Sequence, residues 1–587
     1  MKLLTLKQDT ELRELVRKIA LLNAVRHDGK AQTGPVVGKI LGEKSELRAK
    51  AKEVTALINE ILKEVNSLSL NEQKRIVENE WPEALVKEKV EAEKRLPPLP
   101  NADKYSQIVT RFSPNPDCVL HLGSARAIVL DHEYAQMYKG KFVLRFEDTD
   151  PRTKRPVIEF YDRIREDLVW LDCKPDEEYI QSDRIPIYYE YAEKLLKDGN
   201  AYVCTCQPEH FRERISANRP CECRDLPPEE HLSRWKRMLE GDVKEGEAVM
   251  RVKTDLNHPN PAVRDWPAAR VIDIEKFPHP RVGTEYRVLP LYNLACGIDD
   301  HLMGITHIIR GKEHLTNQVR QEFMYKHLGW KYPEAIHYGR LKITGATLSK
   351  SKIVQGLRDG LYKSWDDPRL ATFAALRRRG IMPGGIKKMI VEIGPKTSDL
   401  ILSWENLYAY NRKNLDQTSD RYFFVQNPIE LKIEQVPKVF TIKLHLHPDR
   451  PERGVREYTI KPKGDEKSAI FWVSQKDIDA SKVGSTVRLM ELFNVRIENA
   501  NVYSAEATFV SESYEDARKL KTPLIHWIPV GEDFPCQVVM PDATIAEGIA
   551  ENACKRLKPN NIIQFERFGF VRIDEVSTKL TAYYAHK

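Results

Sequence analysis

The segment over residues 107–124 constrains the fold more than any other, because it predicts a strand, a turn and a helix start in immediate succession. Three apolar residues suit a buried strand, namely Ile108, Val109 and Phe112. Pro114 and Pro116 exclude a longer strand, because proline cannot donate to a sheet. Helical spacing then runs over residues 125–138, and Gly140 is the expected helix stop.

Such a unit favours an anion at the start of its helix. The first amide groups of a helix lack partners and its dipole is positive there, so a phosphate beside His121 would be stabilised. Gly123 would let a flat base approach the backbone, because glycine has no side chain. Most units of this kind are plain scaffold and most single histidines are structural, so this segment alone does not decide a function.

A second segment, far along the chain, favours the phosphate interpretation. The loop over residues 341–352 contains a glycine and places Lys350 between Ser349 and Ser351. A cation flanked by hydroxyl groups on a loop suits a polyphosphate.

Together the two segments resemble the signatures of class I aminoacyl-tRNA synthetases. His-Leu-Gly-Ser over residues 121–124 looks like the HIGH motif, and Thr-Leu-Ser-Lys-Ser over residues 347–351 looks like KMSKS. Ser124 replaces the second histidine and Thr347 replaces the first lysine. The surrounding runs over residues 111–116, 145–151, 299–311, 447–456 and 566–574 resemble glutamyl-tRNA synthetases of the archaeal type, in the glutamyl and glutaminyl subgroup.

The resemblance implies a multidomain α/β and β protein. We expect a helical N-terminal domain over residues 1–100 and a Rossmann-like catalytic domain over 101–345. An insertion at about 180–290 would bind the acceptor end of tRNA. The KMSKS-like loop and a helical stem-contact domain would follow over 346–419, and two anticodon-binding β-barrels over 420–587.

The local patterns agree with this plan. Five apolar residues predict an amphipathic helix near the N-terminus, namely Leu12, Leu15, Val16, Ile19 and Leu22. A second helical pattern runs from about residue 45 to 68. A second strand is expected over 141–147, with a crossover helix over 155–171. Further strand pieces are expected over 285–295 and 306–310, and the arginines at 377–379 suit either a solvated helix end or phosphate contact.

Two Cys-x-Cys pairs lie inside the predicted insertion. Cys204, Cys206, Cys221 and Cys223 could offer four thiolates to one tetrahedral Zn²⁺. His210, between the pairs, could replace one ligand. The alternative is a set of four reduced thiols.

The resemblance also implies the residues that perform the chemistry. His121 and Lys350 are the expected catalytic residues, acting on ATP with its Mg²⁺. The expected ATP-binding residues are Ser113, Pro114, His121, Gly123, Ser124, Ser349, Lys350 and Ser351. Glutamate has two carboxylates and an ammonium, so its pocket needs guanidinium groups and a carboxylate. The expected glutamate-binding residues are Arg111, Glu147, Tyr292 and Arg310.

Composition sets limits rather than a function. No apolar run approaches the roughly 20 residues of a membrane span, and the N-terminus lacks a secretory pattern, so we expect a cytoplasmic protein. We also expect a monomer, although these features do not bear on oligomeric state. A formal charge of +7 is mild and requires clustering before it supports nucleic-acid binding.

The implied activity is glutamate–tRNA ligation, with tRNA-Glu as partner and tRNA-Gln left open as a second substrate. Two alternatives remain at this stage. A glutaminyl-tRNA synthetase would share the fold, and an RNA-binding paralogue would have lost catalysis.

Overall fold

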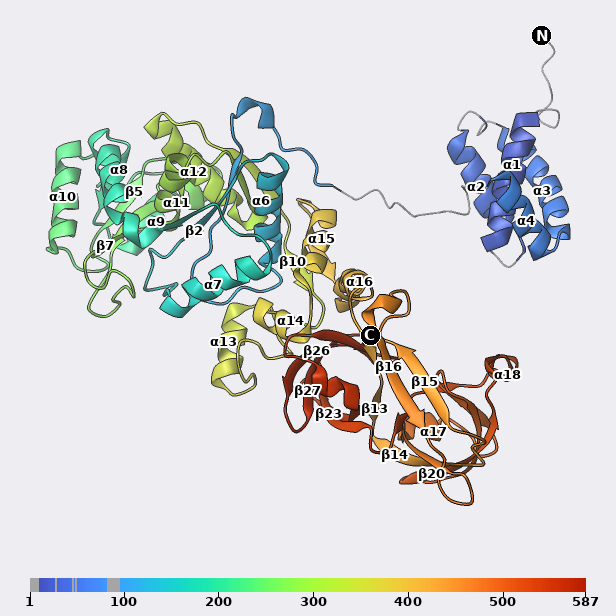
Figure 1. The fold of residues 1–587 in the computed structure, drawn as a ribbon. Helices are drawn as coiled ribbons and strands as arrows, with labels where there is room; N and C mark the ends of the chain where they lie inside the picture. Colours follow the sequence, from blue (N-terminus) through green and yellow to red (C-terminus); the bar gives the residue numbers. More distant parts are fainter. Residues whose placement is uncertain (1–9, 27–28, 45–46, 48–49, 82–94) are drawn as a thin grey trace, which may run out of the picture. The chain divides into compact units, whose positions relative to one another are not determined.

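The computed structural model describes residues 10–26, 29–44, 47, 50–81 and 95–587 (Figure 1). The chain divides into two compact units, residues 1–94 and 95–587. The predicted N-terminal segment 1–9 and the start of the helix expected from residue 45 lie outside the described residues. Among the helices that are described, none has both the length and the apolar character that crossing a membrane requires.

The first unit contains four described helices. Their bounds are α1 Thr10–Arg26, α2 Thr33–Glu43, α3 Ala51–Ser67 and α4 Leu70–Glu80. Helix α1 packs against the other three and buries Leu12, Val16 and Ile19, so the predicted amphipathic helix is confirmed. The Ser69 hydroxyl accepts from the Glu72 N–H, and the Glu72 carboxylate accepts from the Ser69 N–H, which fixes the start of α4.

A parallel sheet forms the centre of the second unit. Strands β1 Val109–Phe112, β2 Lys141–Phe146 and β3 Glu177–Ile180 pair in that order, and β8 His307–Gly311 pairs with β9 Glu334–Tyr338. Thr306 joins the two groups, because its N–H donates to Val109 O at 3.0 Å and its hydroxyl accepts from the Val109 N–H at 2.9 Å. The strand-turn-helix prediction is confirmed by β1 and by α6 Ala125–Met137. The predicted crossover helix is α7 Ile158–Trp170.

The end of α6 differs from the prediction. Lys139, and not Gly140, takes the left-handed conformation, with φ of 50°. A Cβ on Gly140 would lie 2.0 Å from Ile108 O, so the glycine is required for the close approach of the helix end to the strand before it.

The inserted region builds its own antiparallel sheet, in the order β4-β5-β6-β7. Its elements are α8 Ile185–Lys197, β4 Ala201–Cys204, α9 Pro208–Ser216, α10 Pro228–Glu240, β5 Val249–Val252, β6 Pro267–Val271 and β7 Val288–Pro290. A strand does lie within the segment 285–295, but it belongs to this antiparallel sheet and not to the parallel one. It contains only Val288–Pro290, which pair with β6, and α11 Tyr292–Leu302 follows.

Helices α12 Leu315–Leu328, α13 Lys350–Arg358, α14 Phe373–Arg379, α15 Pro383–Ile393 and α16 Trp404–Leu415 complete this part, with β10 Leu341–Ile343 paired to β11 Leu400–Leu402. All three arginines at 377–379 bind protein groups, and Arg379 is 1% exposed, so a solvated helix end is wrong for Arg379, while phosphate contact stays a prediction. Arg377 pairs with Asp167, Arg378 with Asp366 and Asp574, and Arg379 donates to Ala585 O. Helix α14 is thereby tied to the C-terminal strands.

From residue 421 the chain is mostly β-structure, as predicted. Two seven-stranded sheets form, in the orders β12-β25-β26-β27-β23-β24-β13 and β21-β18-β19-β20-β14-β17-β22, beside the hairpin β15-β16. Their bounds are β12 Arg421–Tyr422, β13 Phe424–Gln426, β14 Pro428–Glu434, β15 Phe440–His445, β16 Val455–Ile460, β17 Ala469–Ser474, β18 Thr486–Leu489, β19 Asn494–Ala500, β20 Ser504–Ser511, β21 Leu524–Ile525, β22 Ile528–Pro529, β23 Asp533–Val539, β24 Ile545–Glu551, β25 Ile562–Phe565, β26 Gly569–Val576 and β27 Leu580–His586.

Candidate active site and cysteine cluster

The two predicted phosphate-binding segments lie side by side. Leu348 Cδ1 is 3.6 Å from the point where a Cβ on Gly123 would lie, although the two residues are far apart in sequence. The histidine segment is held from its other side, because the Leu122 N–H donates to Ala371 O at 2.9 Å and the Phe373 N–H donates to Leu120 O at 3.1 Å. The segment before α14 therefore fixes the backbone that carries His121.

The His121 imidazole is partly buried against Gly123. Burial lowers the pKa of His121, and Nδ1 is a buried atom with no hydrogen-bond partner in the described part of the chain. A Cβ on Gly123 would lie 2.8 Å from His121 Cε1. The glycine is thus required by the histidine ring itself, in addition to the base contact expected from sequence.

Lys350 is the first residue of α13, and its ammonium is paired. Nζ lies 2.5 Å from Asp117 Oδ2, while the Lys350 side chain stays 42% exposed. The hydroxyl groups of Ser349 and Ser351 are 3.1 Å apart on either side of it. Sequence reasoning missed Asp117. It lies in the turn between Pro116 and the histidine segment, where nothing marked it as the partner of a distant lysine.

The remaining residues expected to bind ATP lie in the same turn and helix start. Ser113 Oγ is a buried atom without a hydrogen-bond partner among the described residues. Pro114 O accepts from the Glu147 N–H at 2.9 Å, which joins the turn to the end of β2. Ser124 is the N-cap residue of α6.

A cavity of about 600 Å³ opens at the carboxyl ends of the strands, where α/β sheets commonly bind ligands. Its lining includes all four residues expected to bind glutamate, namely Arg111, Glu147, Tyr292 and Arg310. Ser113 also lines it, which places the cavity beside the turn.

Two of the cavity's charged groups, Arg111 and Glu147, belong to one buried network with Arg145 and Asp300. Arg111 Nε donates to Asp300 Oδ1 at 3.1 Å, and Arg145 Nη1 donates to the same oxygen at 2.8 Å. Arg145 Nη2 donates to Glu147 Oε1 at 3.0 Å. Burial opposes charge on Asp300, but the two guanidinium groups lower its pKa to about 2. Asp300 was quoted from sequence only as part of a resembling run.

Arg310 is in a different situation. It is 5% exposed, and its Nη2 donates only to neutral oxygens, Tyr332 Oη at 3.0 Å and Gln321 Oε1 at 3.2 Å. Its Nε and Nη1 atoms are buried without hydrogen-bond partners, and no carboxylate of the described residues lies within ion-pair distance. A buried cation without an anion is costly, so this guanidinium leaves a place for a ligand carboxylate.

Tyr292 faces a histidine that is neutral. The Tyr292 hydroxyl lies 3.4 Å from His314 Nδ1, and Asn317 Nδ2 lies 3.1 Å from the same nitrogen. Burial and the charges of Arg310 and Arg111 lower the pKa of His314 to about 4. The charge of this part of the cavity at neutral pH is therefore set by its arginines and carboxylates.

Comparison with protein families decides the relationship. A family model described as "tRNA synthetases class I (E and Q), catalytic domain" matches residues 107–417, and two models for the anticodon-binding domain of the same group match residues 419–511 and 524–574. The chain belongs to the class I tRNA synthetases of the E and Q group. The predicted class, a class I catalytic domain followed by C-terminal β domains, is confirmed.

Individual relatives agree with the family. This synthetase is 52% identical over 583 residues to the "Glutamate--tRNA ligase" of Pyrococcus abyssi and 52% identical over 584 residues to that of Pyrococcus furiosus, covering 98% of this chain and 100% of each relative. A solved glutamate tRNA ligase from Elizabethkingia meningosepticum is 24% identical and has a TM-score of 0.41, covering 54% of this chain and 70% of that one.

Asp131, a further lining residue of the synthetase's cavity, has an unusual environment. It is 1% exposed, and both carboxyl oxygens lack hydrogen-bond partners within the described residues. Burial raises the pKa of Asp131 well above its ordinary value, and the charge of Arg111 only partly opposes this. Sequence gave no signal for it, because it falls on the predicted helix among apolar residues.

The raised pKa predicts how stability depends on pH. The folded carboxyl keeps its proton above the unfolded pKa of about 3.9, so its contribution to stability is full below that pH and is lost as pH rises toward the folded pKa. We expect Asp131→Asn, which cannot titrate, to gain stability relative to the wild type as the pH rises above about 4. Urea unfolding at several pH values measures this difference, and a constant difference would contradict the assignment.

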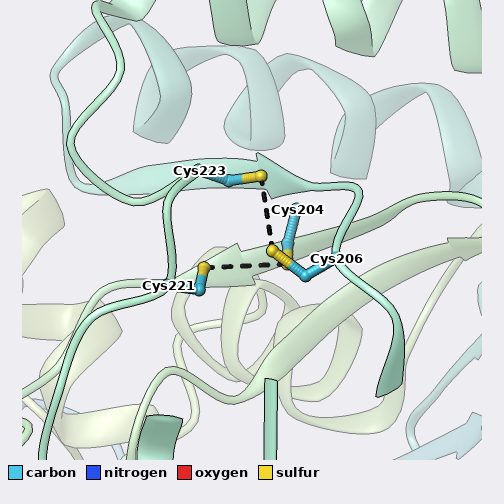
Figure 2. Close-up of side chains that lie close together, drawn as sticks. All are labelled: Cys204, Cys206, Cys221 and Cys223. Carbon is cyan, nitrogen blue, oxygen red and sulfur yellow. Dashed lines mark hydrogen bonds between the residues drawn. The ribbon is translucent and has the colours of Figure 1, made fainter. Parts of the chain in front are cut away.

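The four predicted cysteine ligands come together in the inserted region. Cys204 ends β4, Cys206 follows it, and Cys221 and Cys223 lie in the loop before α10. Figure 2 shows their sulfur atoms pointing toward one another. Cys204 Sγ is 3.8 Å from Cys221 Sγ, Cys206 Sγ is 3.7 Å from Cys223 Sγ, and all four sulfurs lie within 4.8 Å of one another.

These distances fit a tetrahedral zinc site. With Zn–S bonds of about 2.3 Å, the sulfurs of a regular tetrahedron are about 3.8 Å apart. The Thr205 N–H and Arg234 Nη1 approach Cys223 Sγ at 3.5 and 3.4 Å, as donors around a thiolate would. His210, the alternative ligand, instead lies 3.2 Å from Arg214 Nε and 3.3 Å from Glu222 Oε1.

Proposed function

We propose that this synthetase is a glutamate–tRNA ligase, which activates glutamate with ATP and joins it to the 3′ end of tRNA-Glu. The single observation that carries the choice of amino acid is Arg310, a buried cation that lines the cavity and has no carboxylate partner in the described part of the chain. The identity to relatives named glutamate–tRNA ligase, over nearly the whole chain, supports the same activity.

The two alternatives are weaker on physical grounds. A neutral glutamine amide would leave the Arg310 charge uncompensated in a desolvated site, which disfavours a glutaminyl enzyme. A non-catalytic paralogue has no need to keep His121 and Lys350, yet both are present and their segments lie together.

In the proposed pocket, each charge of glutamate meets an opposite charge. The side-chain carboxylate pairs with Arg310, and Arg111 supplies a second cation for the carboxylate that reacts. Glu147 accepts from the ammonium, and the Tyr292 hydroxyl donates to the ligand. The roles follow from the shared cavity and from the pairing of opposite charges.

For activation, a carboxylate oxygen of glutamate attacks the α-phosphorus of ATP, and the bond from that phosphorus to the pyrophosphate oxygen breaks. We assign a hydrogen bond to the phosphate chain to His121 and charge stabilisation of the leaving pyrophosphate to Lys350. Mg²⁺ that arrives with ATP would neutralise part of the same charge. We assign further contacts with ATP to Ser113, Pro114, Gly123, Ser124, Ser349 and Ser351. Before ATP binds, Asp117 would hold the Lys350 ammonium in place. When ATP binds, the ammonium would leave Asp117 and pair with a phosphate oxygen.

In the second step, a hydroxyl of the terminal tRNA ribose attacks the activated carbonyl carbon and AMP leaves. We assign acceptor-end contact to the inserted region and anticodon contact to the C-terminal sheets, whose family models are described as anticodon-binding. The domain boundaries at residues 100, 345 and 419 remain predictions. One chain supplies the cavity and all the residues named, so a monomer would suffice. The proposed location is the cytoplasm. Use of tRNA-Gln in addition remains a proposal.

The cysteine cluster would hold one structural Zn²⁺ through Cys204, Cys206, Cys221 and Cys223. We expect about one zinc per chain in protein purified without chelators, measured by elemental analysis. Cys221→Ser should lower that content and loosen the inserted region while leaving the parallel sheet folded. Cys536→Ser, which changes a buried cysteine of β23, is the matched control. Full loss of zinc in the control, or no zinc in the wild type, would contradict the site.

A direct test of the proposed activity is ATP–pyrophosphate exchange with glutamate, glutamine or aspartate, each with and without a tRNA-Glu transcript. We expect exchange with glutamate only. Exchange with glutamine at an equal rate would favour the glutaminyl alternative, and no exchange with any of them would favour a non-catalytic protein.

A further inference from the structure

We infer that Asp300 is a positioning residue for glutamate: one buried carboxylate orients both Arg111 and, through Arg145, Glu147. The inference rests on the proposed function, in which those two residues bind the amino acid. Asp300 does not line the cavity, so it acts through the side chains it holds.

The geometry of the network supports this role. Asp300 is 1% exposed, and its Oδ1 atom accepts from two guanidinium groups at once, Arg111 Nε at 3.1 Å and Arg145 Nη1 at 2.8 Å. Its Oδ2 atom lies 3.5 Å from Arg111 Nη2. Two contacts from one carboxylate fix the plane of the Arg111 guanidinium as well as its position.

This arrangement determines which part of Arg111 faces the ligand. The edge formed by Nε and Nη2 is turned toward Asp300, so Nη1, which makes no hydrogen bond within the described residues, remains for a carboxylate of glutamate. Without the contacts from Asp300, the long Arg111 side chain would regain several rotamers. Binding of glutamate would then have to fix the side chain in one of them.

The same carboxylate is also linked to Glu147, through Arg145. Arg145, which is fully buried, uses Nη1 for Asp300 and Nη2 for Glu147 at 3.0 Å. The orientation of Glu147 therefore depends on Arg145, and the charge of Arg145 is balanced by Asp300. A single residue thus sets both the cation that meets the reacting carboxylate of glutamate and the anion that meets its ammonium.

Helix α11 explains how the sequence places this group. Tyr292, Cys296 and Asp300 are spaced by four residues and so share one helix face. The neighbouring Asp299 accepts from Tyr188 and Arg184. Its Oδ2 atom also lies 3.9 Å from Arg145 Nε, so it shares in balancing the Arg145 charge, but Asp300 makes the shorter contact at 2.8 Å and pairs with Arg111 as well.

The first test compares Asp300→Asn and Asp300→Glu with the wild type in tRNA charging. In Asp300→Asn we expect the KM for glutamate to rise on the order of 100-fold, the cost of a misplaced substrate contact, while the KM for ATP changes less than about threefold. Asp300→Glu keeps the charge and should recover part of the loss. If Asp300→Asn does not fold, the test compares Asp300→Glu with the wild type, and a higher KM for glutamate is the expected result.

Asp265→Asn is the matched control, because Asp265 is a fully buried aspartate that accepts from Arg224 Nε at 2.8 Å in the inserted region, away from the cavity. It should lower thermal stability as Asp300→Asn does. It should not raise the KM for glutamate more than the KM for ATP. Equal effects of Asp300→Asn on both KM values would reduce Asp300 to a structural role and overturn the inference.

A double-mutant cycle distinguishes this inference from the proposed function. If Asp300 acts mainly through Arg111, adding Asp300→Asn to Arg111→Gln should raise glutamate KM much less than Asp300→Asn does alone. Additive effects would overturn the positioning role. If Arg111→Gln itself leaves glutamate KM unchanged, the assignment of Arg111 to glutamate fails instead.

Discussion

Lys350→Ala is expected to lower the rate of adenylate formation on the order of 100-fold, while tRNA binding changes little. A preorganised ammonium that stabilises transition-state charge contributes on the order of 3 kcal/mol. The structure places Lys350 at the start of α13, with its segment against Gly123 and its ammonium on Asp117. ATP–pyrophosphate exchange, with tRNA present, measures the effect.

The matched control is Lys352→Ala, which removes an exposed lysine two residues along the same helix. It should leave the exchange rate within about threefold of the wild type, because a solvent-exposed charge is screened. Near-normal exchange in Lys350→Ala, or an equal loss in Lys352→Ala, would remove Lys350 from the mechanism.

Arg310→Gln is expected to reduce kcat/KM for glutamate sharply, on the order of 100-fold, and to affect glutamine much less. The side-chain carboxylate of glutamate would lose a charge-assisted bond in a buried site. In the variant, bound glutamine would no longer leave an unpaired cation in the pocket, so the free-energy penalty for binding glutamine would disappear. The network around Arg111 stays shaped for glutamate, and for this reason the variant need not become an efficient glutaminyl enzyme.

The decisive quantity is the ratio of kcat/KM for the two amino acids, measured with one tRNA. Arg320→Gln is the control, because Arg320 also lines the cavity but donates to the backbone oxygen of Ala262. An unchanged ratio in Arg310→Gln would mean that Arg310 does not face the side chain.

The sequence predicted those parts of the fold that local patterns determine. The alternation over residues 141–147 and the prolines at 114 and 116 were enough for β2 and for the turn after β1. Where the patterns failed, a tertiary partner decided the outcome. Gly140 is explained by the backbone of Ile108, and the extended pattern near residue 288 found its partner in β6 instead of the parallel sheet.

The candidate site shows the same limit more clearly. A resemblance could mark Arg111 and Arg310 as binding glutamate. It could not show that Arg111 is paired with a buried aspartate and that Arg310 has no carboxylate partner among the described residues. That difference comes from Asp300, which lies on α11 and contacts Arg111 of β1 only in the folded chain. Asp117 and Asp131 were missed for the same reason, since each gains its meaning from residues distant in sequence.

The most direct measurement of the central claim is charging of a tRNA-Glu transcript by the purified chain with radiolabelled glutamate or glutamine, in parallel with the Arg310→Gln variant. We predict that the wild type attaches glutamate and excludes glutamine, and that the variant loses most of this preference. Attachment of glutamine by the wild type, or an unaltered preference in the variant, would contradict the account.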